Sequence, residues 1–203
     1  MLKESRGRGQ GVGVPHDRRF DKQVSGQKPF GLRTFFRGNE QKKRTDDVIV
    51  QQNGGQAWAS RKTITEGVDL IDKWKVFTSK SSSEHAGQAD KNGMRRVLSL
   101  TGLLPPGSVV TETYVILGAY DSEAEARNCL SYVTSKFFRF LLATRTSAQD
   151  LPRSAYSFVP IQDFARPWRD SDLYAKYGLS EDEISLIEST IRPMSEDDAE
   201  AND

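Results

Sequence analysis

The side chains that most often carry out covalent chemistry are scarce in this chain. There are two histidines, His16 and His85, and one cysteine, Cys129. Neither histidine is placed to be oriented by a carboxylate, and the cysteine lies on the apolar side of a predicted helix, which is typical of a small core residue. A structural zinc site takes about four Cys and His ligands at close spacing, and the sequence does not supply them. These residues predict neither a nucleophile nor a metal site.

Carboxylates are plentiful, and most have structural explanations. Asp121, Glu125 and Glu183 fall at predicted helix starts, where acids complement the helix dipole. A nuclease of the acid-acid-lysine type needs two close acids and a lysine on a neighbouring strand. Glu112 with Lys75 comes nearest to this pattern, so a nuclease is kept as a competing hypothesis.

Methyl transfer to adenine needs two motifs that the chain lacks. The first is a Gly-rich cofactor loop, but the alternating glycines over 7–13 have no predicted strand before them and no helix after them. The second is an Asn/Asp-Pro-Pro-aromatic motif that holds the flipped base. The Pro105-Pro106 pair is preceded by Leu104 and followed by Gly107. We therefore expect no complete catalytic site, and no S-adenosylmethionine site, in this chain.

The elements that would position functional residues come as strands first and helices after. Period-two patterns and β-branched runs predict strands over 48–50, 73–78, 96–100 and 109–120, the second of them half-buried. Asn53-Gly54 predicts a hairpin turn, with Trp58 on the return strand.

Capping boxes predict the helices. Ser122 with Glu125 opens a helix that carries an apolar stripe and runs to about Thr144. A short helix is predicted from Ser171 to Gly178, and Ser180 with Glu183 opens another that Pro193 ends. The fold class is therefore α+β, with a mixed, mostly antiparallel sheet in the N-terminal part, a long packed helix and C-terminal helices.

Charge is distributed unevenly although the net charge is only +1. Residues 1–44 contain twelve Lys and Arg against four Asp and Glu, and residues 195–203 contain five acids and no base. We expect a disordered basic head over 1–19, one domain over 20–194 and a disordered acidic tail over 195–203. A basic head suits a nucleic-acid partner, although a solvated flexible tail explains it equally well.

Cysteine usage and hydropathy bear on the compartment. A single cysteine excludes an intrachain disulfide, which fits a reducing environment. No stretch approaches the ~20 apolar residues that a membrane span needs. We expect a cytoplasmic protein with no membrane partner.

Six segments occur in an order that resembles one family. They are 28–34 (KPFGLRT), 69–76 (DLIDKWKV), 111–118 (TETYVILG), 136–140 (KFFRF), 156–164 (YSFVPIQDF) and 173–179 (LYAKYGL). Together they resemble the C-terminal target-recognition region of bacterial adenine-specific DNA methyltransferases from type II restriction-modification systems. The likeness runs from about residue 20 to residue 194, and residues 1–19 depart from it.

The resemblance implies sequence-specific binding of double-stranded DNA. Catalysis and S-adenosylmethionine would belong to a methyltransferase domain or subunit that lies elsewhere. The parent enzyme would be a site-specific DNA adenine methyltransferase or a bifunctional restriction-modification enzyme. The chain would then be a fragment, a truncated gene product or a separate recognition subunit. A restriction endonuclease, an interaction subunit that docks on a methyltransferase, and an inactive remnant remain as alternatives.

DNA reading implies phosphate contacts from Lys and Arg and base-edge contacts in the major groove. Basic residues at irregular positions are the candidates, because regular helix faces are usually solvated surface. They are Lys28, Arg33, Arg61, Lys62, Lys80, Arg95, Arg96, Arg145 and Arg153. Gly31 would let the backbone approach DNA, and Arg95 or Arg96 would pair with guanine if the long loop over 79–95 orders on DNA. Each candidate is also explained as a solvated charge.

The large aromatic side chains are expected in the core and not against bases. They are Phe30, Phe35, Trp58, Trp74, Phe137, Phe158 and Trp168.

Overall fold

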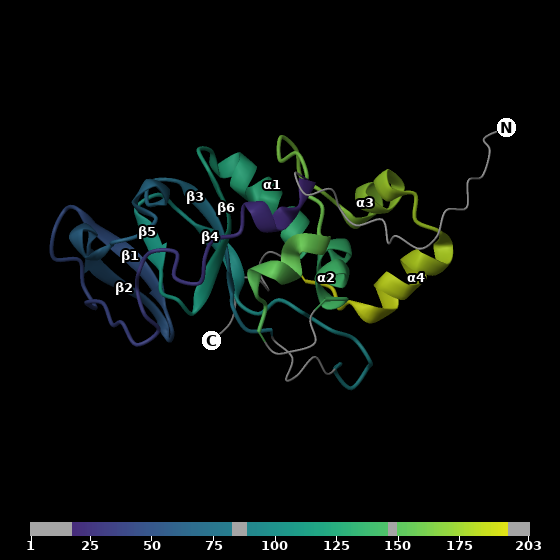
Figure 1. The fold of residues 1–203 in the computed structure, drawn as a ribbon, viewed down its shortest axis with the longest axis horizontal. Helices are drawn as coiled ribbons and strands as arrows, with labels where there is room; N and C mark the ends of the chain where they lie inside the picture. Colours follow the sequence, from purple (N-terminus) through teal and green to yellow (C-terminus); the bar gives the residue numbers. More distant parts are fainter. Residues whose placement is uncertain (1–17, 83–88, 146–149, 195–203) are drawn as a thin grey trace.

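A computed structural model describes residues 18–82, 89–145 and 150–194, which form three layers (Figure 1). The strands are β1 (Asp47–Gln52), β2 (Gly55–Ser60), β3 (Trp74–Ser79), β4 (Thr101–Leu104), β5 (Ser108–Val110) and β6 (Tyr114–Tyr120). A central antiparallel sheet has the order β4-β3-β6, and a second sheet has the order β2-β1-β5. The second sheet lies on one side of the central sheet and the helices lie on the other.

The central sheet is buried on both faces because its side chains enter two separate cores. Along β6, Tyr114 and Ile116 pack in the core shared with the second sheet, which we call the β core. Val115 and Leu117 pack against the helices, in what we call the helical core. Burial on both faces replaces polar–apolar alternation by a nearly continuous apolar run, which is what the sequence of β6 shows.

The second sheet is built on the predicted hairpin. Its turn lies between β1 and β2, where Gly54 and Gly55 have φ of +86° and +118°, a region that glycine enters without a steric penalty. Strand β5 then pairs in parallel with β1, with Val109 opposite Val50. Because β5 lies between β4 and β6 in the sequence, the chain crosses from the central sheet to the second sheet and back.

The inner part of the helical layer consists of α1 (Glu123–Thr134) and α2 (Lys136–Ala143). Ser135 separates them with an extended backbone at φ −61° and ψ 151°. Its hydroxyl accepts the Phe138 N–H at 3.1 Å and donates to the Tyr132 carbonyl at 2.7 Å. Ser135 therefore ends one helix and caps the next, and the prediction of one helix running to Thr144 is wrong.

The helical layer also contains η2 (Phe20–Lys22), η6 (Arg153–Phe158), α3 (Asp170–Tyr177) and α4 (Glu181–Thr190), and two short segments, η3 (Arg61–Thr63) and η4 (Val68–Leu70), lie between β2 and β3. Two predicted boundaries are confirmed: Gly178 ends α3 at φ +62°, and Ser180 with Glu183 forms the capping box of α4. Among the described residues, none of the helices combines the length and hydrophobicity needed to cross a bilayer.

Phe20 carries the start of the described chain into the helical core. Its side chain is fully buried, and its ring meets that of Phe138 edge-on with centroids 4.9 Å apart. Its N–H donates to the Val159 carbonyl at 2.8 Å. The helical core is thus closed by residues from both ends of the fold.

The α+β class is confirmed, and three strand predictions need correction. Residues 96–100 form no strand, since β4 begins at Thr101. The run 109–120 is two strands in different sheets, separated by a turn in which the Tyr114 N–H donates to the Thr111 carbonyl. Strand β3 is not half-buried, because Lys75 on it is fully buried. Residues 1–17 of the expected head over 1–19 and the expected tail over 195–203 lie outside the described residues, as do His16 and His85.

Candidate nucleic-acid interface

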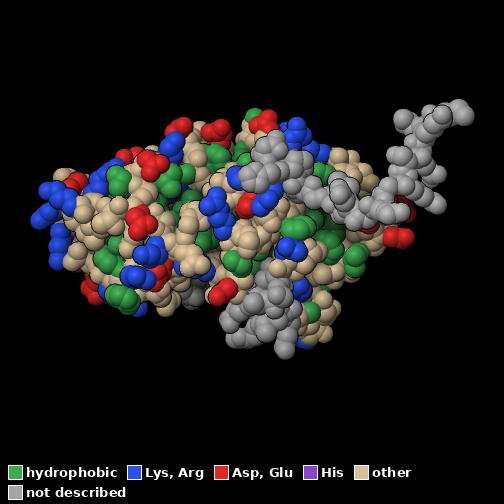
Figure 2. All heavy atoms as spheres, in the orientation of Figure 1, with side chains coloured by type: hydrophobic (Ala, Val, Ile, Leu, Met, Phe, Trp, Pro, Cys, Tyr) green, Lys and Arg blue, Asp and Glu red, His purple; other side chains and the backbone are tan. Residues whose placement is uncertain are grey.

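Basic side chains gather where the chain enters β1 and leaves β2. We call Lys42, Lys43, Arg44, Arg61 and Lys62 the basic end. The hairpin register pairs Asp47 with Ser60, so the residues before β1 lie beside those after β2. Figure 2 shows Lys and Arg side chains clustered over the second sheet. Five cations from two segments of the sequence thus share one surface.

A buried carboxylate shapes the loop that carries three of these cations. Asp47 accepts the backbone N–H groups of Lys43 and Arg44, both at 2.9 Å, and its own N–H donates to the Arg44 carbonyl at 3.3 Å. Asp47 is buried, whereas the side chains of Lys42, Lys43 and Arg44 are exposed. The loop is therefore held from inside while its charges face outward.

The five cations of the basic end differ in the groups that their side chains contact. Arg61 forms two hydrogen bonds with the Asp72 carboxylate, and the bond from Nη1 is 2.8 Å long. These bonds lower the pKa of Asp72 and raise that of Arg61. Lys42 lies over the Trp58 ring, with its nitrogen 5.2 Å from the centroid. Within the described ranges, the side chains of Lys43, Arg44 and Lys62 make no hydrogen bond or ion pair, so they are free to meet an anion.

Arg33 belongs to a second loop, which Glu112 holds near the other end of β1. The Glu112 carboxylate accepts the Thr34 N–H and hydroxyl, both at 3.2 Å, and lies 3.7 Å from an Arg33 nitrogen. The bond from the Thr34 backbone lowers the pKa of Glu112. Glu112 lies in the turn between β5 and β6 and not within a strand, so its structural function is to fix this loop.

Lys75 and Glu112, the two residues that suggested a nuclease, make contacts with different partners. The Lys75 amino group donates to the carbonyls of Leu70 and Ile71, both at 3.0 Å, and thereby closes the turn after η4 (Val68–Leu70). Burial lowers the pKa of Lys75 to about 8. Lys75 and Glu112 therefore each serve a different local structure.

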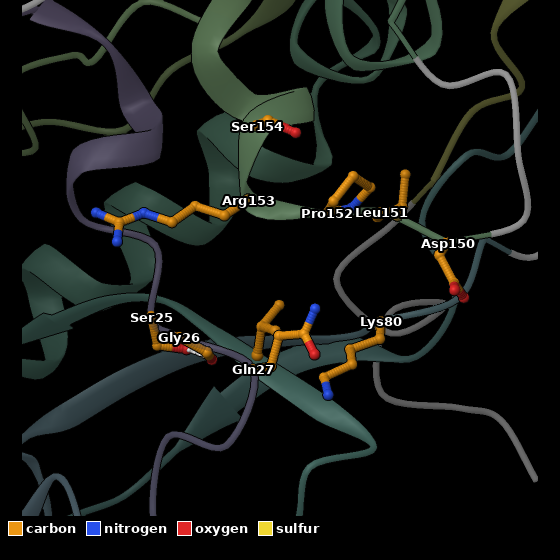
Figure 3. A pocket seen from close by; sticks show the side chains of 10 residues that line it. Ser25, Gly26, Gln27, Lys80, Asp150, Leu151, Pro152, Arg153 and Ser154 are labelled. Carbon is orange, nitrogen blue, oxygen red and sulfur yellow. Dashed lines mark hydrogen bonds between the residues drawn. The ribbon is translucent and has the colours of Figure 1, made fainter.

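Lys80 and Arg153 line a groove of about 550 Å³ (Figure 3). Arg153 extends toward the N-terminal segment and away from Lys80, and it donates to the carbonyls of Asp21 at 2.7 Å and Lys22 at 3.3 Å. Partial burial lowers the pKa of Lys80. Asp150 also lines this groove. The positive charges that line the groove are therefore partly balanced by Asp150. Arg153 mainly joins η6 to the segment that contains Asp21 and Lys22.

The predicted guanine readers lie on the helical side of the central sheet. The Arg95 N–H donates to the Thr190 carbonyl at 2.8 Å, and the guanidinium atoms Nε and Nη2 of Arg95 are buried. The Arg96 carbonyl accepts from Arg139 at 3.1 Å, and Nε of Arg96 is buried as well. Arg145 is exposed and stacks 4.0 Å from the centroid of the Phe158 ring. These three candidates are separated from the basic end by the central sheet.

Lys28 is half-buried, and the glycine at position 31 has an explanation within the fold. Gly31 has φ +75°, and a Cβ added there would lie 2.3 Å from the Thr65 hydroxyl oxygen. The absent side chain therefore makes room for the chain's own Thr65.

Cys129 and seven large aromatic residues were predicted to lie in the core, and the prediction holds for some of them and fails for others. Cys129 is buried, and burial raises its pKa to about 12, which confirms it as a core thiol. Phe30, Phe137 and Trp168 are also buried, whereas Trp58 and Trp74 are partly buried. Phe35 and Phe158 are exposed, so the core prediction is wrong for both.

Sequence reasoning missed Lys42, Lys43 and Arg44. The available signal was three consecutive cations followed within three residues of Arg44 by Asp47. Asp side chains commonly accept nearby backbone N–H groups in turns. A short run of like charges beside such a residue indicates a shaped loop.

No family model, curated protein or solved structure matches this chain. The likeness to type II adenine methyltransferases therefore stays a prediction from motifs, and the function is argued from the surface of the fold.

Proposed function

We propose that this chain is a reader of duplex DNA, acting as the target-recognition portion of an adenine-specific restriction-modification methyltransferase in the bacterial cytoplasm. Methyl transfer and S-adenosylmethionine binding belong to a separate catalytic domain or subunit. The observation that supports DNA binding best is the basic end, in which the unpaired cations Lys43 and Arg44 lie on a loop that Asp47 shapes and Lys62 lies beside them.

Phosphate chemistry explains why this surface suits DNA. Each cation that contacts a phosphate releases condensed counterions, so affinity falls as salt rises. Lys43, Arg44 and Lys62 require no ion pair to be broken first. Because the backbone of the loop is already fixed, binding orders only the side chains.

Sequence choice is the finer part of the proposal, and it rests on the motif resemblance. Phosphate contacts set the register of the protein on DNA, and other side chains then discriminate between bases. Among the DNA-binding residues predicted from the sequence, we assign this task to Arg33, which is exposed on the loop that Glu112 holds. Its ion pair at 3.7 Å is loose and exposed, and such pairs are weak.

The direct test is a fluorescence anisotropy titration of a duplex of about 25 base pairs across roughly 50–300 mM salt. We expect binding that weakens steeply with salt. In Lys43→Gln/Arg44→Gln, the slope of log affinity against log salt should fall by about two. The matched control is Arg127→Gln/Arg169→Gln, which removes the same charge from exposed positions in the helical layer. Absence of binding at low salt, or equal loss in the control, contradicts the proposal.

The choice of base sequence is tested by a separate experiment. Repeated selection of bound duplexes from a randomised pool at about 150 mM salt should enrich one short motif. The pure chain should transfer no methyl group from S-adenosylmethionine to that motif. An unenriched pool would reduce the function to nonspecific binding, and methyl incorporation would overturn the assignment of catalysis to another domain.

A further inference from the structure

Phe35 is the most exposed large apolar side chain in the described residues, with 80% of its surface accessible. Its neighbour Phe36 points the other way and packs against the β core. An exposed phenylalanine forgoes the free energy that burial of its ring would give. The sequence predicted both a core position and no base contact for Phe35, and the structure removes the reason for that prediction.

The loop that presents Phe35 is fixed on both sides of it. Before Phe35, the Glu112 carboxylate holds the N–H and hydroxyl of Thr34. After it, the Arg37 guanidinium donates to the carbonyls of Thr34 at 3.0 Å and Phe36 at 2.8 Å. The Phe36 N–H also donates to the Arg33 carbonyl at 3.0 Å and closes a tight turn. The ring is thus displayed by a preformed structure, so little entropy is lost when a ligand binds it.

The chemistry around the ring favours a nucleobase over a protein groove. Arg33 and Arg37 flank Phe35 in the sequence, and both are exposed. An apolar protein groove would have to desolvate these two cations. A base offers a flat π-face to the ring, and its backbone offers phosphates to the guanidinium groups.

We propose that Phe35 stacks on a base at a deformed step of the bound duplex, with Arg33 and Arg37 on the adjoining phosphates. This inference rests on the proposed function and deepens it. Aromatic and apolar side chains that enter a base step partly unstack it and kink the duplex. Phe35 is therefore the residue through which the protein deforms DNA, while the basic end supplies attraction.

The test uses the full chain and a set of duplexes, each carrying one 2-aminopurine, whose fluorescence rises when it is unstacked. Wild-type protein should raise the fluorescence at one or two adjacent positions. Phe35→Ala should abolish that rise and weaken binding roughly 5- to 150-fold, which corresponds to about 1–3 kcal/mol for one stacked base. Its salt slope should stay unchanged. Phe35→Tyr should keep the rise, because it keeps the ring.

Leu186→Ala is the matched control, since Leu186 is 56% exposed on α4 in the helical layer. It should leave both binding and fluorescence unchanged. If wild-type protein binds with the expected salt dependence but Phe35→Ala behaves identically, the stacking inference is overturned and the proposed function stands. If wild-type protein does not bind at all, the proposed function fails. Loss of association with a methyltransferase subunit, with DNA binding intact, would instead make Phe35 a protein contact.

Discussion

Arg61 and Asp72 join the end of β2 to the start of β3 through two side-by-side hydrogen bonds, so one of the five cations of the basic end is already neutralised. Asp72 is exposed and Arg61 is partly exposed, and an ion pair in contact with solvent contributes little to stability. The carboxylate therefore competes with a phosphate for the same guanidinium fork.

Removing the charge of Asp72 should strengthen DNA binding, because a phosphate then no longer competes with the carboxylate for Arg61. In Asp72→Asn we expect affinity to rise about two- to tenfold and the salt slope to increase by about one. Anisotropy titrations at several salt concentrations measure both. The control Glu123→Gln releases Arg127 from an equivalent exposed pair on α1. Equal strengthening in the control would mean that net charge alone matters, and not the position of Arg61.

Removing the carboxylate that shapes the basic loop should cost stability and order. Asp47→Ala leaves the N–H groups of Lys43 and Arg44 without their acceptor, and we expect a loss of about 1–3 kcal/mol in the free energy of unfolding. Urea titration measures this loss, and hydrogen exchange should speed up at those two amides. Asp46→Ala removes the same charge from the exposed neighbouring residue and should change neither reading. Slow exchange in Asp47→Ala would show that the loop holds its shape unaided.

Ser135 should stabilise the fold about as much as a typical helix N-cap residue does. Replacing it by alanine removes the acceptor of the Phe138 N–H, and we expect the unfolding free energy to fall by about 0.5–2 kcal/mol. Ser189→Ala on α4 is the control, because the Ser189 hydroxyl is exposed and bonds only within its own helix. A neutral Ser135→Ala would indicate that packing alone separates α1 from α2.

Lys75 should make stability depend on pH in the alkaline range. Its pKa falls from an ordinary 10.5 to about 8 because burial disfavours the charged form. Between these values the unfolded chain binds more protons than the folded one, so stability rises with pH through this window, by at most about 1.4 kcal/mol per pH unit. Below about pH 8 the cost of charging the buried amine is present in full.

Denaturant titrations of wild type and Lys75→Met at pH values roughly one unit either side of the folded-state pKa of about 8 isolate this contribution. The difference between the two proteins cancels the tyrosines and Cys129, whose raised pKa values act in the opposite direction. We expect the wild-type curve to rise relative to that of the variant. Parallel curves would mean that the carbonyls of Leu70 and Ile71 keep Lys75 charged throughout.

Local signals predicted the parts of the fold that local contacts determine. The hairpin at Asn53-Gly54 and the capping box of Ser180 with Glu183 each need only a few consecutive residues. The split of 109–120 between two sheets could not be read from the sequence, because both halves are apolar and only tertiary pairing tells them apart. The break between α1 and α2 at Ser135 could not be predicted for a similar reason, because the apolar stripe continues from one helix into the next.

The candidate site was less accessible to sequence reasoning than the fold. Arg61 and Lys62 were singled out because they follow the predicted hairpin, and the structure leaves Lys62 exposed and Arg61 partly exposed. The burial of Arg95 nitrogens and the display of Phe35 depend on contacts with residues distant in the sequence, as in the 78-residue separation between Thr34 and Glu112. Charge and aromatic character therefore indicated the chemistry, whereas tertiary contacts decided which residues offer it.

The burial of Phe20 among residues near the other end of the fold has a consequence for biosynthesis. Every residue of the β core lies at or before Ile116, so that core can close while the ribosome is still translating. Phe20 must instead wait for Phe138 and Tyr156, a delay of roughly ten seconds at bacterial elongation rates. The surface that we assign to DNA would thus mature first on the nascent chain, and the helical layer would fold last.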